Sequence, residues 1–235
     1  MKPSTSASAV AIIALSFAAG ATDAFAFLSL GGIFTANMTG NLILIGLFQR
    51  PTYLITVIGA LTAIVVFVVA LFIGFTTTKP DGTGMAYRRV FGLLAVTGVI
   101  QFAVALGWLV LPTRDDLWMQ CIFIALSASA MAFQTVIAKR LFSATGLSTT
   151  YVTGSITSLI EDMVAKKSGA VQVIRAGSVL TLVAGAFAGA AIIFFVMPLG
   201  AVLPLVGVIV AVVALWQIGR GSASTPAVTA PTTAA

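Results

Sequence analysis

The chain has 235 residues, of which 60% are hydrophobic and 8% are charged, and its formal net charge is +6. A soluble domain carries roughly 25% charged residues, so a soluble fold of this composition would expose apolar surface that only a lipid bilayer accommodates. The chain has no histidine and one cysteine, Cys121, which excludes histidine-based catalytic triads, histidine-ligated zinc and an internal disulfide. We expect neither a metal nor another cofactor.

The 12 basic residues lie singly or in pairs between apolar stretches and form no stripe with interleaved aromatic side chains. Membrane topology therefore explains the positive charge better than binding to nucleic acid does. The lipid bilayer is the partner that the composition predicts.

The first predicted span runs from Val10 to Leu30, after a cytoplasmic N-terminal tail of residues 1–8. A basic N-terminus, this apolar run and the triplet Ala24-Phe25-Ala26 imitate a secretory signal peptide with its cleavage site. Asp23 lies just before that site, however, and the apolar stretch continues to Leu30 without a break. We therefore expect the first span to be retained.

About 20 apolar residues are needed for each crossing of a bilayer. By this criterion five further spans follow: Tyr53 to Phe75, Val90 to Leu111, Leu117 to Ala138, Val171 to Val196 and Leu199 to Ile218. The sequence thus predicts an all-α fold, a polytopic membrane helix bundle with a first membrane repeat in residues 9–111 and a second in residues 117–219. Residues 221–235 lack periodicity and are expected to form a disordered C-terminal tail.

The distribution of basic residues predicts the orientation. With the N-terminus in the cytoplasm, the other basic residues lie inside and only Arg50 and Arg114 lie outside. This is a strong positive-inside bias. We expect both termini to lie in the cytoplasm.

Two stretches, Gly31 to Gln49 and Leu141 to Asp162, remain outside the six spans. If both crossed the membrane, Lys79 and two pairs of basic residues would move to the outer side, against the charge rule. Both are therefore predicted as re-entrant or broken helical segments, which protein or a water-filled cavity has to surround.

These two stretches resemble each other. Gly-Ile-Phe-Thr-Ala-Asn-Met-Thr-Gly-Asn, from Gly32 to Asn41, aligns without gaps on Gly-Leu-Ser-Thr-Thr-Tyr-Val-Thr-Gly-Ser, from Gly146 to Ser155. Each copy follows the first span of its half and precedes two more. Because each half has an odd number of crossings, the halves are predicted to be inverted repeats whose re-entrant tips meet near the middle of the membrane.

The residue types at these tips suit a binding site. Gly40 and Gly154 permit positive φ or close backbone approach, and the polar side chains beside them can cap a half-helix. The positive end of such a half-helix attracts an anionic or polar group. Caps and small residues are equally ordinary features of packed membrane helices, so the sequence leaves both interpretations open. The candidate residues at the tips are Asn37, Thr39, Gly40, Asn41, Thr153, Gly154 and Ser155.

Three motifs resemble the YoaK family, bacterial membrane proteins classed as a domain of unknown function. They are Gly20-Ala-Thr-Asp23-Ala, the run from Phe34 to Asn41, and Gln134 before the second Thr-Gly copy. The resemblance covers the chain up to Arg220. Where such proteins often read Gly-x-Gln-Asn, this chain has Ala132-Phe133-Gln134-Thr135. The resemblance implies a bacterial inner-membrane protein and supplies no substrate.

Asp23 is the only acidic residue inside a predicted span. An ionisable group at membrane depth is a candidate for proton or cation coupling. The alternative is that Asp23 is solvated near the end of its helix or is hydrogen-bonded to Asn37 or Asn41 as a structural clasp. Gln134 and Gln101 are expected to form interhelical hydrogen bonds.

The sequence predicts structural roles for three further sets of residues. Glu161 and Asp162 are expected to form a solvated cytoplasmic ion-pair cluster with the lysines that follow them. Gly177, Gly185 and Gly189 place small residues on one helical face, which suits close packing either within the chain or in a homo-oligomer. Trp108, Trp118 and Trp216 lie near span ends, where aromatic residues anchor helices in the interface.

Together these features predict a secondary carrier or exporter of a small polar or anionic metabolite, with Asp23 as a proton-coupling group. The alternatives are a non-transporting membrane component that binds a lipid or a partner protein, and a channel. An enzyme is not expected, because Asp23 has no second carboxylate, histidine or nucleophile-base pair at membrane depth.

Overall fold

The computed structural model describes residues 5–79, 85–111, 116–141, 152–166 and 169–221. Within these ranges the chain forms eight α-helices and one short 3-10 turn. Six helices are long and apolar enough to cross a membrane, which confirms the predicted polytopic α-helical fold. They are α1 (Thr5–Ser29), α3 (Tyr53–Thr77), α4 (Met85–Val110), α5 (Leu117–Leu141), α7 (Ala170–Phe195) and α8 (Leu203–Gly221).

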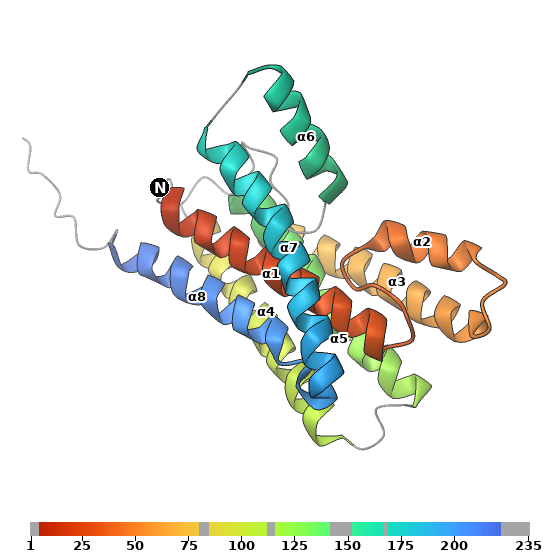
Figure 1. Ribbon diagram of the computed structural model, residues 1–235. Helices are drawn as coiled ribbons and strands as arrows, with labels where there is room; N and C mark the ends of the chain where they lie inside the picture. Colours follow the sequence, from red (N-terminus) through yellow and green to blue (C-terminus); the bar gives the residue numbers. More distant parts are fainter. Residues whose placement is uncertain (1–4, 80–84, 112–115, 142–151, 167–168, 222–235) are drawn as a thin grey trace, which may run out of the picture.

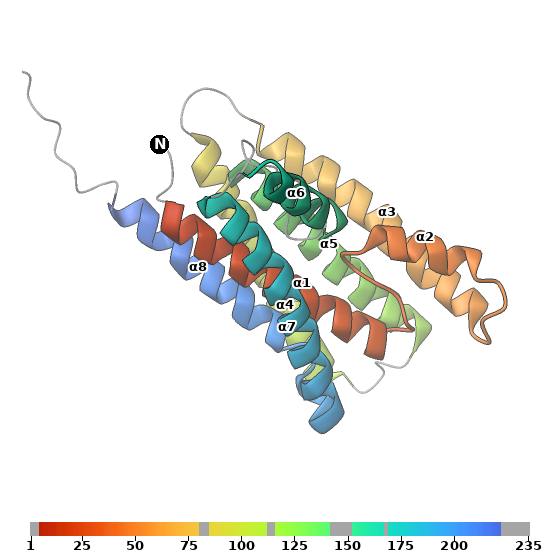
Figure 2. The same cartoon turned by 45° about the horizontal axis from the view of Figure 1, so that its top comes forward.

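The helix ends differ from the predicted spans by a few residues. α1 starts at Thr5, so the expected N-terminal tail is partly helical. α8 ends at Gly221, and the tail beyond it lies outside the described residues. The start of α1 and the end of α8 lie at the same end of the bundle (Figures 1 and 2).

Two shorter helices occupy the stretches between the spans. α2 (Met38–Gly46) has nine residues and α6 (Val152–Val164) has thirteen. At 1.5 Å per residue they measure about 14 and 20 Å, less than the roughly 30 Å hydrocarbon core. After α1 the chain turns back toward the middle of the bundle before α2 begins, and α3 starts at the end where α1 finished (Figures 1 and 2). The first of the two segments is therefore re-entrant; the approach to α6 lies outside the described residues.

Helices of one half pack mainly on helices of the other. α1 contacts α7 and α8, and α5 contacts α3 and α4. The short helices also behave alike, because α2 packs on α3 and α6 packs on α7. If α1 to α4 are matched in order with α5 to α8, each of these contacts has a counterpart in the other half.

The closest helix packing is between α1 and α7. A Cβ added to Gly20 would overlap the Leu182 carbonyl oxygen, and one added to Gly185 would overlap the Phe17 carbonyl oxygen. Gly177 and Gly189 also face α1. Of the two partners considered for this glycine face, the structure shows the one within the chain, since α1 covers the face.

One expectation about the aromatic side chains is wrong. Trp108 is not an interfacial anchor, because it is fully buried and packs edge-on against Phe25 and Phe123, with ring centroids 4.9 and 5.5 Å away. Asp162 forms an ion pair with the buried Arg175 at 2.7 Å, a partner that was not predicted, and Lys167 of the expected cluster lies outside the described residues. This pair joins α6 to α7.

The α1–α7 contact predicts that Gly185→Ala lowers the thermal unfolding midpoint of the purified protein in detergent. The added methyl forces two backbones apart, and overpacking of this kind costs about 1–3 kcal/mol. Gly92→Ala in α4 is the matched control, because an added Cβ there meets nothing within 4 Å. Equal midpoints for the two variants would contradict the described packing.

Candidate functional site

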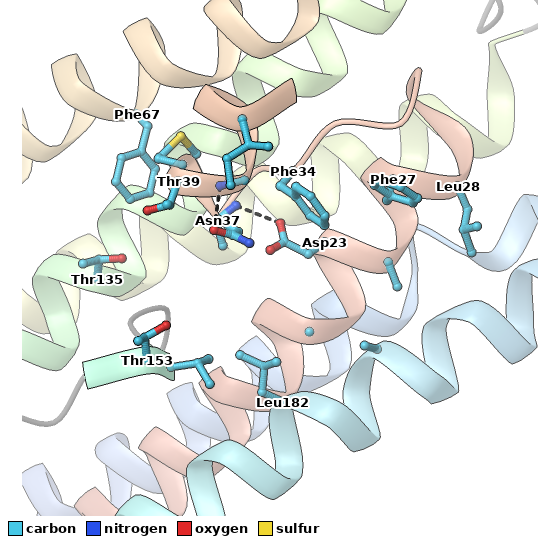
Figure 3. A pocket seen from close by; sticks show the side chains of 18 of the residues that line it. Asp23, Phe27, Leu28, Phe34, Asn37, Thr39, Phe67, Thr135, Thr153 and Leu182 are labelled. Carbon is cyan, nitrogen blue, oxygen red and sulfur yellow. Dashed lines mark hydrogen bonds between the residues drawn. The ribbon is translucent and has the colours of Figure 1, made fainter. Parts of the chain in front are cut away.

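A cavity of about 1480 Å³ lies between the helices of the bundle. Its walls come from α1, the loop before α2, α2 itself, α3, α5, the start of α6 and α7. Both predicted Thr-Gly segments reach it, because Thr39 and Thr153 line the same space (Figure 3). Residues 114 positions apart in sequence thus contribute equivalent hydroxyl groups to one site.

Asp23 holds the loop that leads into α2. Its Oδ1 accepts hydrogen bonds from the backbone N–H groups of Thr35 at 2.7 Å and Ala36 at 2.8 Å, and from the Thr35 hydroxyl at 3.2 Å. The carboxylate thereby satisfies backbone donors that no helix or strand pairs, a condition that irregular chain inside a membrane has to meet. Asp23 does form a clasp, with Thr35 and Ala36 as its main partners and the Asn37 N–H as a further backbone donor.

Asn41 fixes the same loop from α2. Its side-chain oxygen accepts from the Phe34 N–H at 2.9 Å, and its side-chain nitrogen donates to the Phe34 carbonyl at 2.7 Å. Asn41 is fully buried. Asn37 is the N-cap of α2, and its oxygen accepts from the Gly40 N–H at 3.0 Å.

Glycines make this loop possible. Gly31 and Gly32 have φ values of +83° and +73°, which lie in the region that favours glycine, and they reverse the chain after α1. Gly40 is needed for close approach instead, because a Cβ there would lie 2.9 Å from the Phe34 ring and 3.0 Å from the Asn37 amide nitrogen.

The predicted site residues divide into two sets. Those that line the cavity are Asp23, Asn37, Thr39, Gly40 and Thr153, and those that do not are Asn41, Gln134, Gly154 and Ser155.

The two glutamines behave differently. Gln101 donates to the Thr22 hydroxyl at 3.2 Å, which confirms the expected interhelical hydrogen bond. Gln134 is fully buried, and neither of its side-chain polar atoms has a hydrogen-bond partner among the described residues. The structure offers no physical account of this side chain.

Several lining residues were not predicted from sequence. Lys139 and Arg140 of α5 contribute two cations, and Thr135 lies one helical turn before Lys139. Arg140 is engaged at the end of α3, where its guanidinium donates to the Phe75 carbonyl at 3.0 Å and the Thr78 hydroxyl at 3.2 Å. The apolar walls include Phe27, Phe34, Phe67, Phe75 and Leu182.

Residues 11–215 match the protein family described as "Protein of unknown function (DUF1275)". The chain belongs to this family. It is 35% identical over 149 residues to the "UPF0700 transmembrane protein YoaK" of Bacillus subtilis (strain 168), an alignment that covers 63% of this chain and 64% of that protein. The chain thus matches somewhat less than two thirds of the length of this relative. No solved structure gives a significant match.

The match confirms the resemblance to the YoaK family that the Asp23, Asn41 and Gln134 motifs indicated. Together with the six apolar helices it establishes a multi-pass membrane protein. Two of the three motifs meet at one place in the fold, since Asp23 and Asn41 hold consecutive residues of the same loop.

The buried position of Asn41 predicts that Asn41→Ala destabilises the protein more than Asn37→Ala does. The first substitution leaves the Phe34 N–H and carbonyl without partners, and each buried group left unpaired costs about 1–3 kcal/mol. The second removes an exposed N-cap, which costs about 1 kcal/mol. Thermal unfolding in detergent measures the difference, and a larger effect at Asn37 would argue against the clasp.

The shared cavity predicts a short distance between Thr39 and Thr153. Spin labels at these two positions, in protein with Cys121→Ser, should lie well within the roughly 30 Å hydrocarbon thickness when their separation is measured by electron paramagnetic resonance. Labels at Tyr53 and Thr77, the two ends of α3, provide a reference of about 36 Å. A Thr39–Thr153 distance as long as this reference would exclude a common site.

Proposed function

We propose that this protein is a secondary carrier or exporter of a small polar metabolite in the bacterial inner membrane, with Asp23 as its proton-coupling group. The observation that carries the proposal is a carboxylate, Asp23, inside a membrane-spanning helix and at the wall of the cavity. An ionisable group of this kind, at the wall of a cavity, is the usual mark of a transport or proton pathway.

The depth of Asp23 fits this role. It lies six residues before the end of α1, about 9 Å along the helix, and the cavity it lines also contains Lys139 and Arg140. A proton bound at Asp23 would alter the charge balance of this cavity. The hydroxyl groups of Thr39 and Thr153 and the Asn37 amide add uncharged polar partners for a ligand (Figure 3).

The arrangement of the halves supports alternating access. The contacts of α1 with α7 and α8 have counterparts in those of α5 with α3 and α4, as an inverted repeat requires. In such folds the site lies at the interface between the repeats and opens to either side when one repeat rocks against the other. We include the inverted repeat and the cytoplasmic location of both termini in the proposal; the positive-inside bias supports the latter.

An anionic cargo receives less support than a neutral polar or cationic one. Three N–H groups in and just before the first turn of α2 already bind the oxygens of Asp23 and Asn37.

The second candidate is a non-transporting component that binds a lipid or a partner protein. Apolar side chains dominate the wall of the cavity beside α1, where Phe27 and Leu28 are exposed. On α6, Ile156, Ile160 and Met163 are exposed as well. In this case Asp23 would act only as the clasp of the α2 loop.

Asp23→Asn separates the two candidates. Asparagine keeps an oxygen for the Thr35 and Ala36 N–H groups but removes the charge, so folding should persist while proton coupling is lost. Purified protein in liposomes with an internal pH-sensitive dye, challenged with pools of small metabolites, should move protons with one pool, and Asp23→Asn should reduce this flux about ten-fold or more, the effect of losing a charged hydrogen bond.

The matched control is Asp162→Asn, which removes a carboxylate outside the cavity. It should leave the flux unchanged, provided that the protein folds. Metabolite-driven proton flux that persists in Asp23→Asn would refute the coupling role, and the absence of flux with every pool would favour the non-transporting candidate.

A further inference from the structure

The hydrogen bonds that polar groups of the cavity already form within the protein indicate the chemical class of its ligand. In the loop before α2 the Thr35 and Ala36 N–H groups bind Asp23 Oδ1, and in the first turn of α2 the Gly40 N–H binds Asn37 Oδ1. The protein's own carboxylate therefore lies in front of the positive end of the helix. An anionic ligand group at this place would find no free donor among these groups and would be repelled by Asp23.

The group that can still bind a ligand at this end of the cavity is a hydrogen-bond acceptor, the carboxylate of Asp23. Asp23 Oδ1 accepts the hydrogen bonds from Thr35 and Ala36, and the Asn37 N–H is a further backbone donor beside the carboxylate. Among the described residues no cation forms an ion pair with Asp23. Arg140 is held by the Phe75 carbonyl and the Thr78 hydroxyl, so it is directed to the end of α3. A carboxylate at the wall of a cavity inside a membrane favours a cationic partner, and an ammonium group of a ligand would supply one.

Aromatic rings lie next to this carboxylate. Phe34 is beside Asp23 at the edge of the cavity (Figure 3). Its ring is stacked on that of Phe27, with centroids 5.0 Å apart and an interplanar angle of 26°. Phe67 contributes a third ring from α3. Aromatic faces attract ammonium groups and pack against apolar tails, so this wall suits both parts of an organic amine.

We propose that the cavity binds a protonated organic amine whose ammonium group donates to Asp23 Oδ2 and whose apolar or aromatic tail packs along Phe27, Phe34 and Phe67. This inference rests on the proposed function, because it names the cargo of the same site. It also gives the coupling a physical form: a proton and the amine compete for one carboxylate, with Lys139 and Arg140 as the other charged groups of the cavity.

A set of matched probes tests the amine class. Phenylpropylamine, phenylpropanol and phenylpropionate share a ring and a chain and differ in charge, and the corresponding butyl compounds lack the ring. Calorimetric titration of purified protein in detergent should give affinity for the amine at least about ten-fold higher than for the alcohol or the acid, the difference expected for a charged hydrogen bond. In Asp23→Asn this preference should disappear.

Two variants control for folding and for the other cation. Phe27→Leu keeps the carboxylate and removes a ring, so it should weaken phenylpropylamine more than butylamine. Lys139→Gln removes the second charge and should leave amine binding intact. Tightest binding of phenylpropionate, lost in Lys139→Gln, would overturn the proposal, as would amine binding that is equal in wild type and Asp23→Asn.

The liposome experiment distinguishes failure of this inference from failure of the carrier proposal. If no amine binds to folded protein while another metabolite pool drives proton flux dependent on Asp23, the amine class is wrong and the carrier stands. If amines bind through Asp23 but move no protons in liposomes, the amine site stands and the carrier proposal fails. If amines neither bind nor drive flux, the amine site is refuted.

Discussion

The hydrogen bonds from the Thr35 and Ala36 N–H groups to Asp23 hold an irregular stretch of chain inside the helix bundle. Lipid supplies no partners for backbone polar groups, so this stretch depends on side chains that replace water. Asp23 from α1 and Asn41 from α2 together bind three consecutive residues, Phe34 to Ala36. The position of α2, and with it the wall of the cavity, follows from these bonds.

The second half lacks the corresponding side chains. Ile137 and Ser155 stand at the positions that align with Asp23 and Asn41, and Ile137 is buried. The two halves thus share their helix contacts while only the first carries a carboxylate at this point. The scaffold formed by the two halves is therefore approximately symmetric in its helix contacts and asymmetric in its charge.

Much of the architecture was predictable because it depends on length and composition. Six apolar stretches of about 20 residues predicted the six long helices, and the odd crossing number predicted that the two Thr-Gly segments share a site, which agrees with Thr39 and Thr153 lining one cavity. The α1–α7 contact was predictable as a small-residue face, although its partner was not, since glycine spacing indicates close approach without naming the other helix.

The detail of the site depended on tertiary contacts that no local pattern contains. Asn41 was expected at the site but is buried as a clamp, because its amide matches both polar groups of Phe34. Lys139 and Arg140 were used for topology alone, although the spacing from Thr135 to Lys139 places both on one face of a helix and could have indicated the cavity. The phenylalanine side chains that line the cavity could not be predicted, since phenylalanine is an ordinary residue in a membrane span.

The contact between α1 and α7 has a consequence for biogenesis. The Thr181 hydroxyl donates to the Ile13 carbonyl across a separation of 168 residues, so α1 leaves the ribosome well before α7, the helix that packs on it most closely. At roughly 5–20 residues per second, α1 waits on the order of ten seconds or more in the bilayer before this partner is made. During that interval the face of α1 that will contact α7 is uncovered, which makes the insertion machinery, or lipid, a temporary substitute for the later helix.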